Sequence, residues 1–350
     1  MSYEFDFAVF IGRFQPVHQG HLQVVRSGLA RAQKLIVLLG SAWQARNPRN
    51  PWSHQEREQM LRGCLSASDN ERLICLPLMD VPYNDELWVR NVQSTVSGLV
   101  TAHHTTPLQP PRIALIGHRK DQSGFYLNLF PQWHSIAVDN YQSISATPLR
   151  QQFFDRSRCA ALLQQDDRLP AAVQQWLAGF AAQQPEYQQI CDEIDFIGQY
   201  KQAWQAAPYA PTFVTVDALV VQSGHVLLVE RRANPGKGLW ALPGGFVDQQ
   251  ERLLDACLRE LREETRLKVP AAVLKGSIKR QAVFDDPHRS ARGRTITHAF
   301  YIELDASASL PKVRGGDDAR CARWLPLGEL QPQQLFEDHY FIIQDLLGHA

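Results

Sequence analysis

Two sets of side chains in this 350-residue sequence are suited to phosphate chemistry, and they lie far apart in the chain. In the first set, Arg13 precedes a His-Gln-Gly-His pattern that runs from His18 to His21. The two imidazoles can donate hydrogen bonds to phosphate oxygens as charge develops in a transition state, and the guanidinium adds a planar cationic fork. Because Gly20 lets a ligand approach the backbone closely at a predicted helix start, we predict a phosphate-binding site here.

Three carboxylates form the second set. Glu260, Glu263 and Glu264 have i, i+3 and i+4 spacing, so they share one face of a predicted helix. Carboxylates this close repel one another unless cations lie between them, and Arg259 is placed to orient Glu263. Oxygen ligands of this kind suit Mg²⁺ or Mn²⁺, which acidify water and polarise a diphosphate. The pattern therefore predicts metal-assisted cleavage of a diphosphate.

Two further loops support the first site. Thr147 is a predicted helix N-cap and Pro148 the first helical residue, so Arg150 projects from a helix start. Residues 117–121 supply a second cationic loop directly after a predicted strand. Both features favour phosphate, since a helix N-terminus carries partial positive charge.

The elements that position the first site alternate between strands and helices. Apolar runs predict buried strands at residues 7–11, 35–40, 113–117 and 136–138. Helices are predicted around residues 53–65 and 85–99. This alternation is typical of an α/β domain with a parallel, doubly wound sheet, which binds ligands at the carboxyl ends of its strands.

The second half of the chain has a different pattern. Residues 148–204 are helical in spacing, and residues 206–211 resemble a linker. Beyond the linker, strands are predicted at 212–221, 225–230, 275–283 and 295–304, with a helix over 251–265. Ser223 and Gly224 separate the first two strands, which predicts a hairpin. We therefore predict a first domain at 1–185, a helical connector at 186–207 and an α+β domain with a mixed sheet at 208–350.

Composition excludes some classes of protein. The 36 basic and 36 acidic residues balance, which argues against nucleic acid as a partner. We find no apolar stretch long enough to span a bilayer and no signal-peptide pattern. The six cysteines are scattered, as in reduced proteins. We expect a cytoplasmic protein that binds neither nucleic acid nor membrane; self-association into homo-oligomers stays open.

The first set resembles the HxGH nucleotidyltransferase superfamily, whose second motif, ISxTxxR, is matched by Ile144, Ser145, Thr147 and Arg150. The form of residues 12–16 is similar to archaeal-type nicotinamide-mononucleotide adenylyltransferases. The resemblance implies a Rossmann-like domain that transfers the adenylyl group of ATP to nicotinamide mononucleotide (NMN), giving NAD and pyrophosphate, with Mg²⁺ bridging phosphate oxygens. By that resemblance, catalytic roles fall to His18, His21, Arg13 and Arg150, nucleotide binding to Gly12, Phe14, Gly20, Lys120, Asp121, Ser145 and Thr147, and nicotinamide binding to Asp80, Tyr83 and Trp88.

The second set resembles the Nudix box, GX5EX7REUXEEXGU, from Gly245 to Leu267. One position departs: Arg266 stands where the box has a glycine, which normally ends the helix. The box implies metal ligation by Gly244, Glu260, Glu263 and Glu264, with Glu263 also catalytic. Similarity to the ADP-ribose pyrophosphatases of the family implies ADP-ribose binding by Asp286, Arg292 and Arg294, with Asp317 or Asp318 as the general base.

Together the two halves resemble bifunctional NMN adenylyltransferase/Nudix hydrolases. The resemblance implies NAD synthesis together with hydrolysis of ADP-ribose to AMP and ribose 5-phosphate. Two alternatives stay open for the second half. In the first alternative the second half acts on another nucleoside diphosphate derivative such as NADH. In the second alternative it is a ligand-sensing regulatory domain. The intact carboxylate triad argues against a pure sensor, which has no need of metal ligands.

Overall fold

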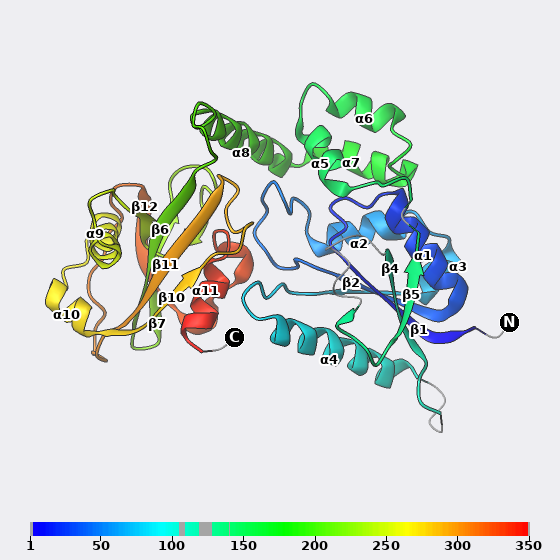
Figure 1. Ribbon diagram of the computed structural model, residues 1–350, viewed down its shortest axis with the longest axis horizontal. Coiled ribbons are helices and arrows are strands. Elements are labelled where there is room, and N and C mark those ends of the chain that lie inside the picture. Colours follow the sequence, from blue (N-terminus) through cyan, green and yellow to red (C-terminus); the bar gives the residue numbers. More distant parts are fainter. Residues whose placement is uncertain (1–2, 105–108, 119–127, 140, 349–350) are drawn as a thin grey trace. The chain divides into compact units, whose positions relative to one another are not determined.

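A computed structural model describes residues 3–104, 109–118, 128–139 and 141–348 of the chain (Figure 1). Contacts between residues divide it into two compact units. Unit 1 consists of Met1–Asp80 and Asn84–Cys191, and unit 2 of Val81–Tyr83 and Asp192–Ala350. In the described ranges no helix is both long and apolar enough to cross a lipid bilayer.

Unit 1 is built on a five-stranded sheet whose paired strands are all parallel, in the order β3-β2-β1-β4-β5. This confirms the predicted α/β domain with a parallel, doubly wound sheet. The strand order reverses direction beside β1, and doubly wound sheets bind ligands at such a point. The strand β3 was not predicted, since a five-residue run that ends in proline gives little periodicity. The strands are β1 (Phe5–Gly12), β2 (Ala32–Leu39), β3 (Leu73–Pro77), β4 (Ile113–His118) and β5 (His134–Val138).

Helices cover both faces of this sheet (Figure 1). The helix α4 buries Val92, Val96 and Val100 against alternate residues of β1 and β2 such as Val9 and Ile36. The opposite face receives α1, which contacts β1, β2 and β4. The helices of unit 1 are α1 (Gln19–Arg31), α2 (His54–Arg62), α3 (Ala67–Arg72), α4 (Asp85–His103), α5 (Ala146–Phe154), α6 (Cys159–Gln165) and α7 (Ala171–Gln183), and α8 (Pro185–Gln202) runs on into unit 2.

Unit 2 contains a mixed sheet with the path β10-β11-β6-β7-β12, to which β8 adds at β7 and β9 at β6. The predicted hairpin is confirmed: Ser223 and Gly224, with φ of 47° and 73°, form the turn between β6 and β7. The strands are β6 (Thr212–Gln222), β7 (His225–Arg231), β8 (Trp240–Ala241), β9 (Gly244–Phe246), β10 (Ile278–Phe284), β11 (Arg294–Glu303) and β12 (Ala319–Pro326).

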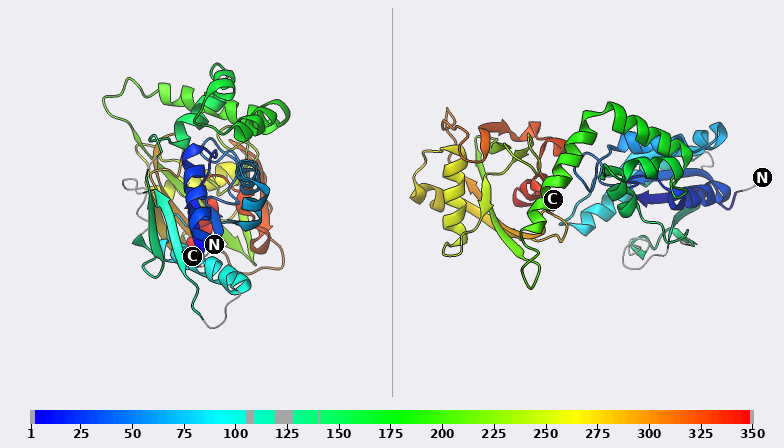
Figure 2. Two further views of the ribbon diagram at one scale, coloured as in Figure 1. Left: turned by 90° about the vertical axis from the view of Figure 1, so that its right-hand side faces the viewer. Right: turned by 90° about the horizontal axis from the view of Figure 1, so that it is seen from above.

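Two helices pack on opposite faces of the mixed sheet (Figures 1 and 2). The helix α9 (Leu253–Thr265) joins the core of one face, which includes Val216, Ala218 and Val220, and α11 (His339–Leu346) joins that of the other. The strand predicted at 275–283 begins only at Ile278, because the short helix α10 (Ala271–Gly276) comes first.

Candidate active sites

A cavity of about 250 Å³ lies where β1, β4 and two helix starts meet in unit 1. It brings most residues of the first predicted set close to the predicted helix start that bears Thr147 and Arg150. Its lining includes Gly12, Arg13, Phe14, His18, His21, His118, Ser145, Thr147 and Arg150. Lys120 and Asp121 lie outside the described residues.

The two histidines of the motif are stacked at the start of α1, with ring centroids 3.7 Å apart. The backbone N–H of His18 donates to Nδ1 of His21 at 3.2 Å. Since Nδ1 accepts, the neutral ring of His21 carries its proton on Nε2. A Cβ at Gly20 would lie only 3.1 Å from the His18 ring, so a side chain there would require the ring to shift by a few tenths of an ångström.

His118 lines the cavity and belongs to the predicted cationic loop at 117–121, although no role of its own was predicted for it. Its Nε2 lies 3.1 Å from the carbonyl oxygen of Gly20 and its Nδ1 lies 3.2 Å from that of Val138. It therefore ties the carboxyl end of β4 to the start of α1. The sequence offered one signal for it, its position directly after a predicted strand.

Arginines give the cavity its positive charge. Arg150 is 7% exposed, and it donates to the carbonyl oxygens of Pro48 at 2.9 Å and Gln15 at 2.7 Å. Burial, with the charges of Arg13 and Arg49, lowers the pKa of Arg150 to about 10. Burial and the charge of Arg49 also lower the pKa of Arg13. Cations held together out of water favour an anionic ligand.

The start of α5 corrects one prediction. Ser145, not Thr147, occupies the N-cap position, and the helix begins at Ala146. Pro148 is tolerated inside the first turn because N–H groups there have no helical acceptor. The Thr147 hydroxyl instead accepts from Nη2 of Arg150 at 3.4 Å.

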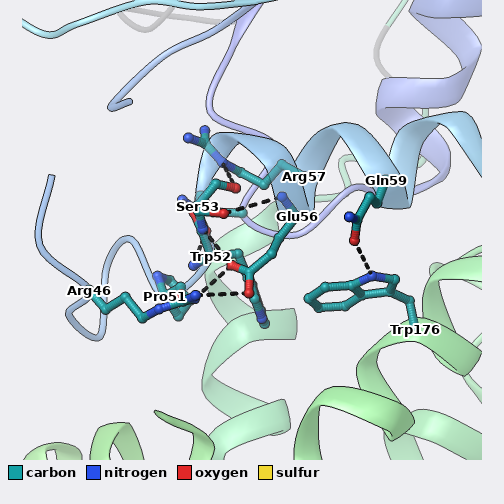
Figure 3. A network of polar contacts seen from close by, with 9 residues as sticks. Arg46, Pro51, Trp52, Ser53, Glu56, Arg57, Gln59 and Trp176 are labelled. Atoms are coloured by element: carbon teal, nitrogen blue, oxygen red, sulfur yellow. Dashed lines mark hydrogen bonds and ion pairs between the residues drawn. The ribbon is translucent and has the colours of Figure 1, made fainter. Parts of the chain in front are cut away.

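Arg57 on α2 is a second residue that sequence reasoning missed. Its side chain is 0% exposed, and Nη1 donates to the carbonyl oxygens of Arg13 and Gly40, both at 2.6 Å. It thus joins the loops that follow β1 and β2. Figure 3 shows how α2 holds it: Ser53 and Glu56 form a capping box at the helix start, and the Nε of Arg57 donates to the Ser53 carbonyl.

The three predicted nicotinamide residues have different neighbours. Asp80 accepts from the Oγ of Ser41 at 2.6 Å and from its N–H at 3.0 Å, so it shapes the loop after β2. The Trp88 ring packs near Phe130 in the core beneath α4. Tyr83 belongs to unit 2, where its hydroxyl bonds to Asp338. Nicotinamide binding by these three residues stays a prediction.

The second site lies between α9 and β9 in unit 2. Glu264 is 8% exposed, and its Oε2 accepts from the N–H of Gly244 at 3.0 Å. Burial raises the pKa of Glu264 to about 8, and the charge of Glu260 adds to the effect. The carboxylate of Glu260 lies so close to Gly245 that a Cβ there would be 2.5 Å from Oε1. Two desolvated carboxylates thus face a glycine-rich strand.

Arg259 organises the remaining carboxylates of α9. It bonds to Glu251 at 2.9 Å, to Glu260 at 2.7 Å and to Glu263 at 3.1 Å. The charge of Asp317, a residue with a φ of 47°, helps to raise the pKa of Glu260 after burial and Glu263. The charge of Asp317 therefore acts on this site.

The carboxylates suit a hard divalent cation. The described part of the chain contains no ready-made cluster of three His, Cys, Asp or Glu side chains that could hold a metal ion, and Arg259 binds both Glu260 and Glu263. After burial, the charge of Glu260 raises the pKa of Glu264, and a cation between the two carboxylates would remove that repulsion.

Helix α9 ends at the residue that departs from the box. Arg266 takes the left-handed conformation, with a φ of 54°, in the place of the expected glycine. The loop before β12 completes the end: Arg314 donates its N–H to Thr265 at 2.9 Å, and Gly316 donates to Glu264 at 3.1 Å. These backbone N–H groups thus donate to carbonyls of the last helical turn, which have no hydrogen-bond donor within the helix.

The predicted ADP-ribose residues are spread along one loop. Asp286 accepts from the N–H of His288 at 2.7 Å, and Arg294 pairs with Asp285 at 3.8 Å. Arg292 lies over the ring of Phe246, 5.2 Å from its centroid, and its charge lowers the pKa of Arg231. Arg292 thus acts on Arg231, and ADP-ribose binding by the three residues stays a prediction.

Comparison with known proteins gives a relative for each half. Residues 9–212 match the cytidylyltransferase-like family and residues 211–346 the NUDIX domain family. A nicotinamide/nicotinic acid mononucleotide adenylyltransferase of Acinetobacter baylyi is 39% identical over 154 residues, 44% of this chain and 78% of that protein. An ADP-ribose pyrophosphatase of Methanocaldococcus jannaschii is 35% identical over 139 residues, 40% of this chain and 75% of that protein.

One solved protein matches both halves in the same order. The crystal structure of a bifunctional NMN adenylyltransferase/ADP ribose pyrophosphatase from Francisella tularensis, complexed with AMP and a Mn ion, is 36% identical. The alignment has a TM-score of 0.87 and covers 98% of this chain and 99% of that one. The chain therefore belongs to the family of proteins in which a cytidylyltransferase-like domain is followed by a NUDIX domain, as in that Francisella protein.

Proposed function

We propose that the chain is a bifunctional enzyme of NAD metabolism. Unit 1 transfers the adenylyl group of ATP to NMN, and unit 2 hydrolyses ADP-ribose to AMP and ribose 5-phosphate. The observation that carries the proposal is the pair of separate phosphate sites on one chain, a cationic cavity and a carboxylate helix. The names of the two relatives and of the Francisella protein agree with it.

In unit 1, the phosphate of NMN attacks the α-phosphorus of ATP, and the bond to pyrophosphate breaks. This reaction needs no protein nucleophile, so the residues position and stabilise. His21 presents an Nε2 donor to the transferring phosphate, and Arg13 and Arg150 hold the triphosphate. Gly20 leaves room for that approach.

In unit 2, a water oxygen attacks one phosphorus of the diphosphate, and the bridging P–O bond breaks to release AMP and ribose 5-phosphate. Glu260, Glu264 and the carbonyl of Gly244 would hold Mg²⁺ or Mn²⁺, which polarises a diphosphate and acidifies water when bound. Arg259 fixes the orientation of Glu260 and Glu263. We assign the role of general base to Glu263, whose side chain is 44% exposed, or to Asp317, whose charge acts on Glu260.

Product analysis tests both halves on the full chain. With NMN, ATP and Mg²⁺ we expect NAD and pyrophosphate; absence of NAD would refute the first half. With ADP-ribose we expect AMP and ribose 5-phosphate, dependent on Mg²⁺ or Mn²⁺ and lost on chelation. Faster cleavage of NADH would assign another substrate, and binding of ADP-ribose without cleavage would assign a sensor.

A further inference from the structure

Unit 2 holds a second group of charged side chains beside the carboxylate helix. Three arginines, Arg231, Arg289 and Arg292, lie near the segment Phe336–His339, which includes Glu337 and Asp338. Backbone and ring contacts join this segment to the strand that leads to Gly244. Phe336 donates its N–H to the carbonyl of Trp240 at 2.8 Å, and Leu242 donates to Nδ1 of His339 at 2.9 Å.

The three arginines are not used alike. Arg289 forms a buried two-pronged pair with Asp338, with both N–O distances at 2.9 Å. Arg231 bonds only through Nε, to the carbonyl of Pro235 at 2.8 Å, while its guanidinium stacks on Phe336 at 4.0 Å. Arg292 also bonds only through Nε, to Ser290 at 3.4 Å. Within the described residues, the terminal nitrogens of Arg231 and Arg292 therefore make no hydrogen bond.

Glu337 combines two unusual features. Its φ is 46°, a left-handed conformation that costs a non-glycine residue energy. Its Oε1 is shielded from solvent and has no hydrogen-bond partner among the described residues. Burial raises the pKa of Glu337 to about 7, while the nearby Arg292 and a hydrogen bond between Ser290 and the carboxylate act to lower it. A buried acceptor without a donor is costly unless a ligand supplies one.

Arg231 links this group to the carboxylate site. Its N–H donates to the carbonyl oxygen of Leu239 at 2.9 Å, in the segment that leads to Gly244. Its positive charge also opposes the burial that raises the pKa of Glu264. Two free guanidinium forks suit phosphate oxygens. The Oε1 acceptor of Glu337 suits a hydroxyl donor. A ligand that combines a phosphate with neighbouring hydroxyls is a ribose 5-phosphate ester.

We propose that Arg231, Arg292 and Glu337 form a sugar-phosphate subsite beside Glu264, in which the arginines contact phosphate oxygens and Glu337 accepts a hydrogen bond from a ribose hydroxyl. The inference rests on the proposed function of unit 2, since both products of ADP-ribose hydrolysis contain this group. It adds Arg231 and Glu337 to the residues that bind substrate.

The test compares two inhibitors of ADP-ribose hydrolysis by the full chain, ribose 5-phosphate and inorganic phosphate. The wild type should prefer ribose 5-phosphate. Glu337→Gly suits the φ of 46°, so the variant should fold as well as the wild type. We expect its preference for ribose 5-phosphate to fall about tenfold or more while inhibition by phosphate stays unchanged. Glu337→Gln, which retains an acceptor oxygen and the side-chain shape, should lose less of the preference.

Controls separate the subsite from the proposed function. Arg231→Ala should weaken both inhibitors, and Glu329→Gln, at an exposed position, should change neither. An unchanged preference in folded Glu337→Gly would overturn the subsite but not the hydrolase. Absence of ADP-ribose turnover in the wild type would instead overturn the hydrolase, and calorimetric titration with the same two compounds would then decide on the subsite.

Discussion

At the residue scale, Gly245 shows how a missing side chain leaves room for the carboxylate of Glu260, a proposed metal ligand. A Cβ at Gly245 would lie 2.5 Å from Oε1 of Glu260, at the flexible end of that side chain. We expect Gly245→Ala to leave the fold intact and to displace the carboxylate. Disturbed ligand orientation typically costs roughly 10- to 100-fold in metal affinity or activity.

The measurement is ADP-ribose hydrolysis together with thermal unfolding. Gly276→Ala is the matched control, because a Cβ at Gly276 meets nothing within 4 Å. If Gly245→Ala hydrolysed ADP-ribose at the wild-type rate, the Glu260 carboxylate would not need its place against the strand.

The residues that the sequence revealed are those with fixed spacing along one element. His18 and His21 share one helix start, and Glu260 and Glu264 one helix face, so the distance along the chain predicts their proximity. Arg57, Arg231 and Glu337 have no such local pattern. Their roles depend on which segments the tertiary fold brings beside them, which one sequence without its fold does not contain.

At the scale of the element, the end of α9 carries strain that the family pattern avoids. Arg266 holds a φ of 54°, and a non-glycine residue there costs about 1 kcal/mol. We expect Arg266→Gly to raise the free energy of unfolding of unit 2 by about that amount. Arg266→Ala, which keeps the strain, should give no gain. A loss of stability in Arg266→Gly, measured by denaturant titration, would mean that packing of the arginine against Gly316 outweighs the strain.

The start of α11 makes unit 2 sensitive to acid. His339 accepts from the N–H of Leu242 at 2.9 Å, and burial lowers its pKa to about 3. Its 3.9 Å approach to Asp217 is therefore not an ion pair of a charged imidazole. Because the unfolded chain binds a proton near pH 6.5 and the folded one does not, stability is lost as the pH falls from about 6.5 towards 3.

A substitution isolates this effect from other groups. His339→Asn keeps an acceptor near the position of Nδ1 but does not titrate. Between pH 7 and pH 5 the wild type should lose about 2 kcal/mol more of its unfolding free energy than the variant. The buried carboxyls Glu264 and Glu337 have raised pKa values and act in the opposite direction, so only the difference between the two proteins is informative. Parallel pH profiles would show that His339 does not control acid stability.

For the whole molecule, the order of elements was more predictable than their ends. Alternating strands and helices identified the parallel sheet of unit 1, and the Ser223-Gly224 turn identified a hairpin of unit 2. The sequence did not reveal that the contact boundary falls inside α8, between Cys191 and Asp192. The boundary lies within a continuous helix, so the sequence contains no glycine- or proline-rich loop to mark it.

Each proposed active site draws its described side chains from a single unit. His21 and its cavity belong to unit 1, and Glu264 and its strand to unit 2. We therefore expect His21→Ala to reduce NAD synthesis by about 100-fold or more and Glu264→Gln to abolish ADP-ribose hydrolysis. Each variant should retain the other activity within roughly twofold, because substitutions without shared neighbours combine additively. Steady-state assays of both reactions on each variant and on the double variant give the comparison. If a folded His21→Ala protein lost both activities, the two sites would be coupled, and the double variant would then fall short of the product of the single effects.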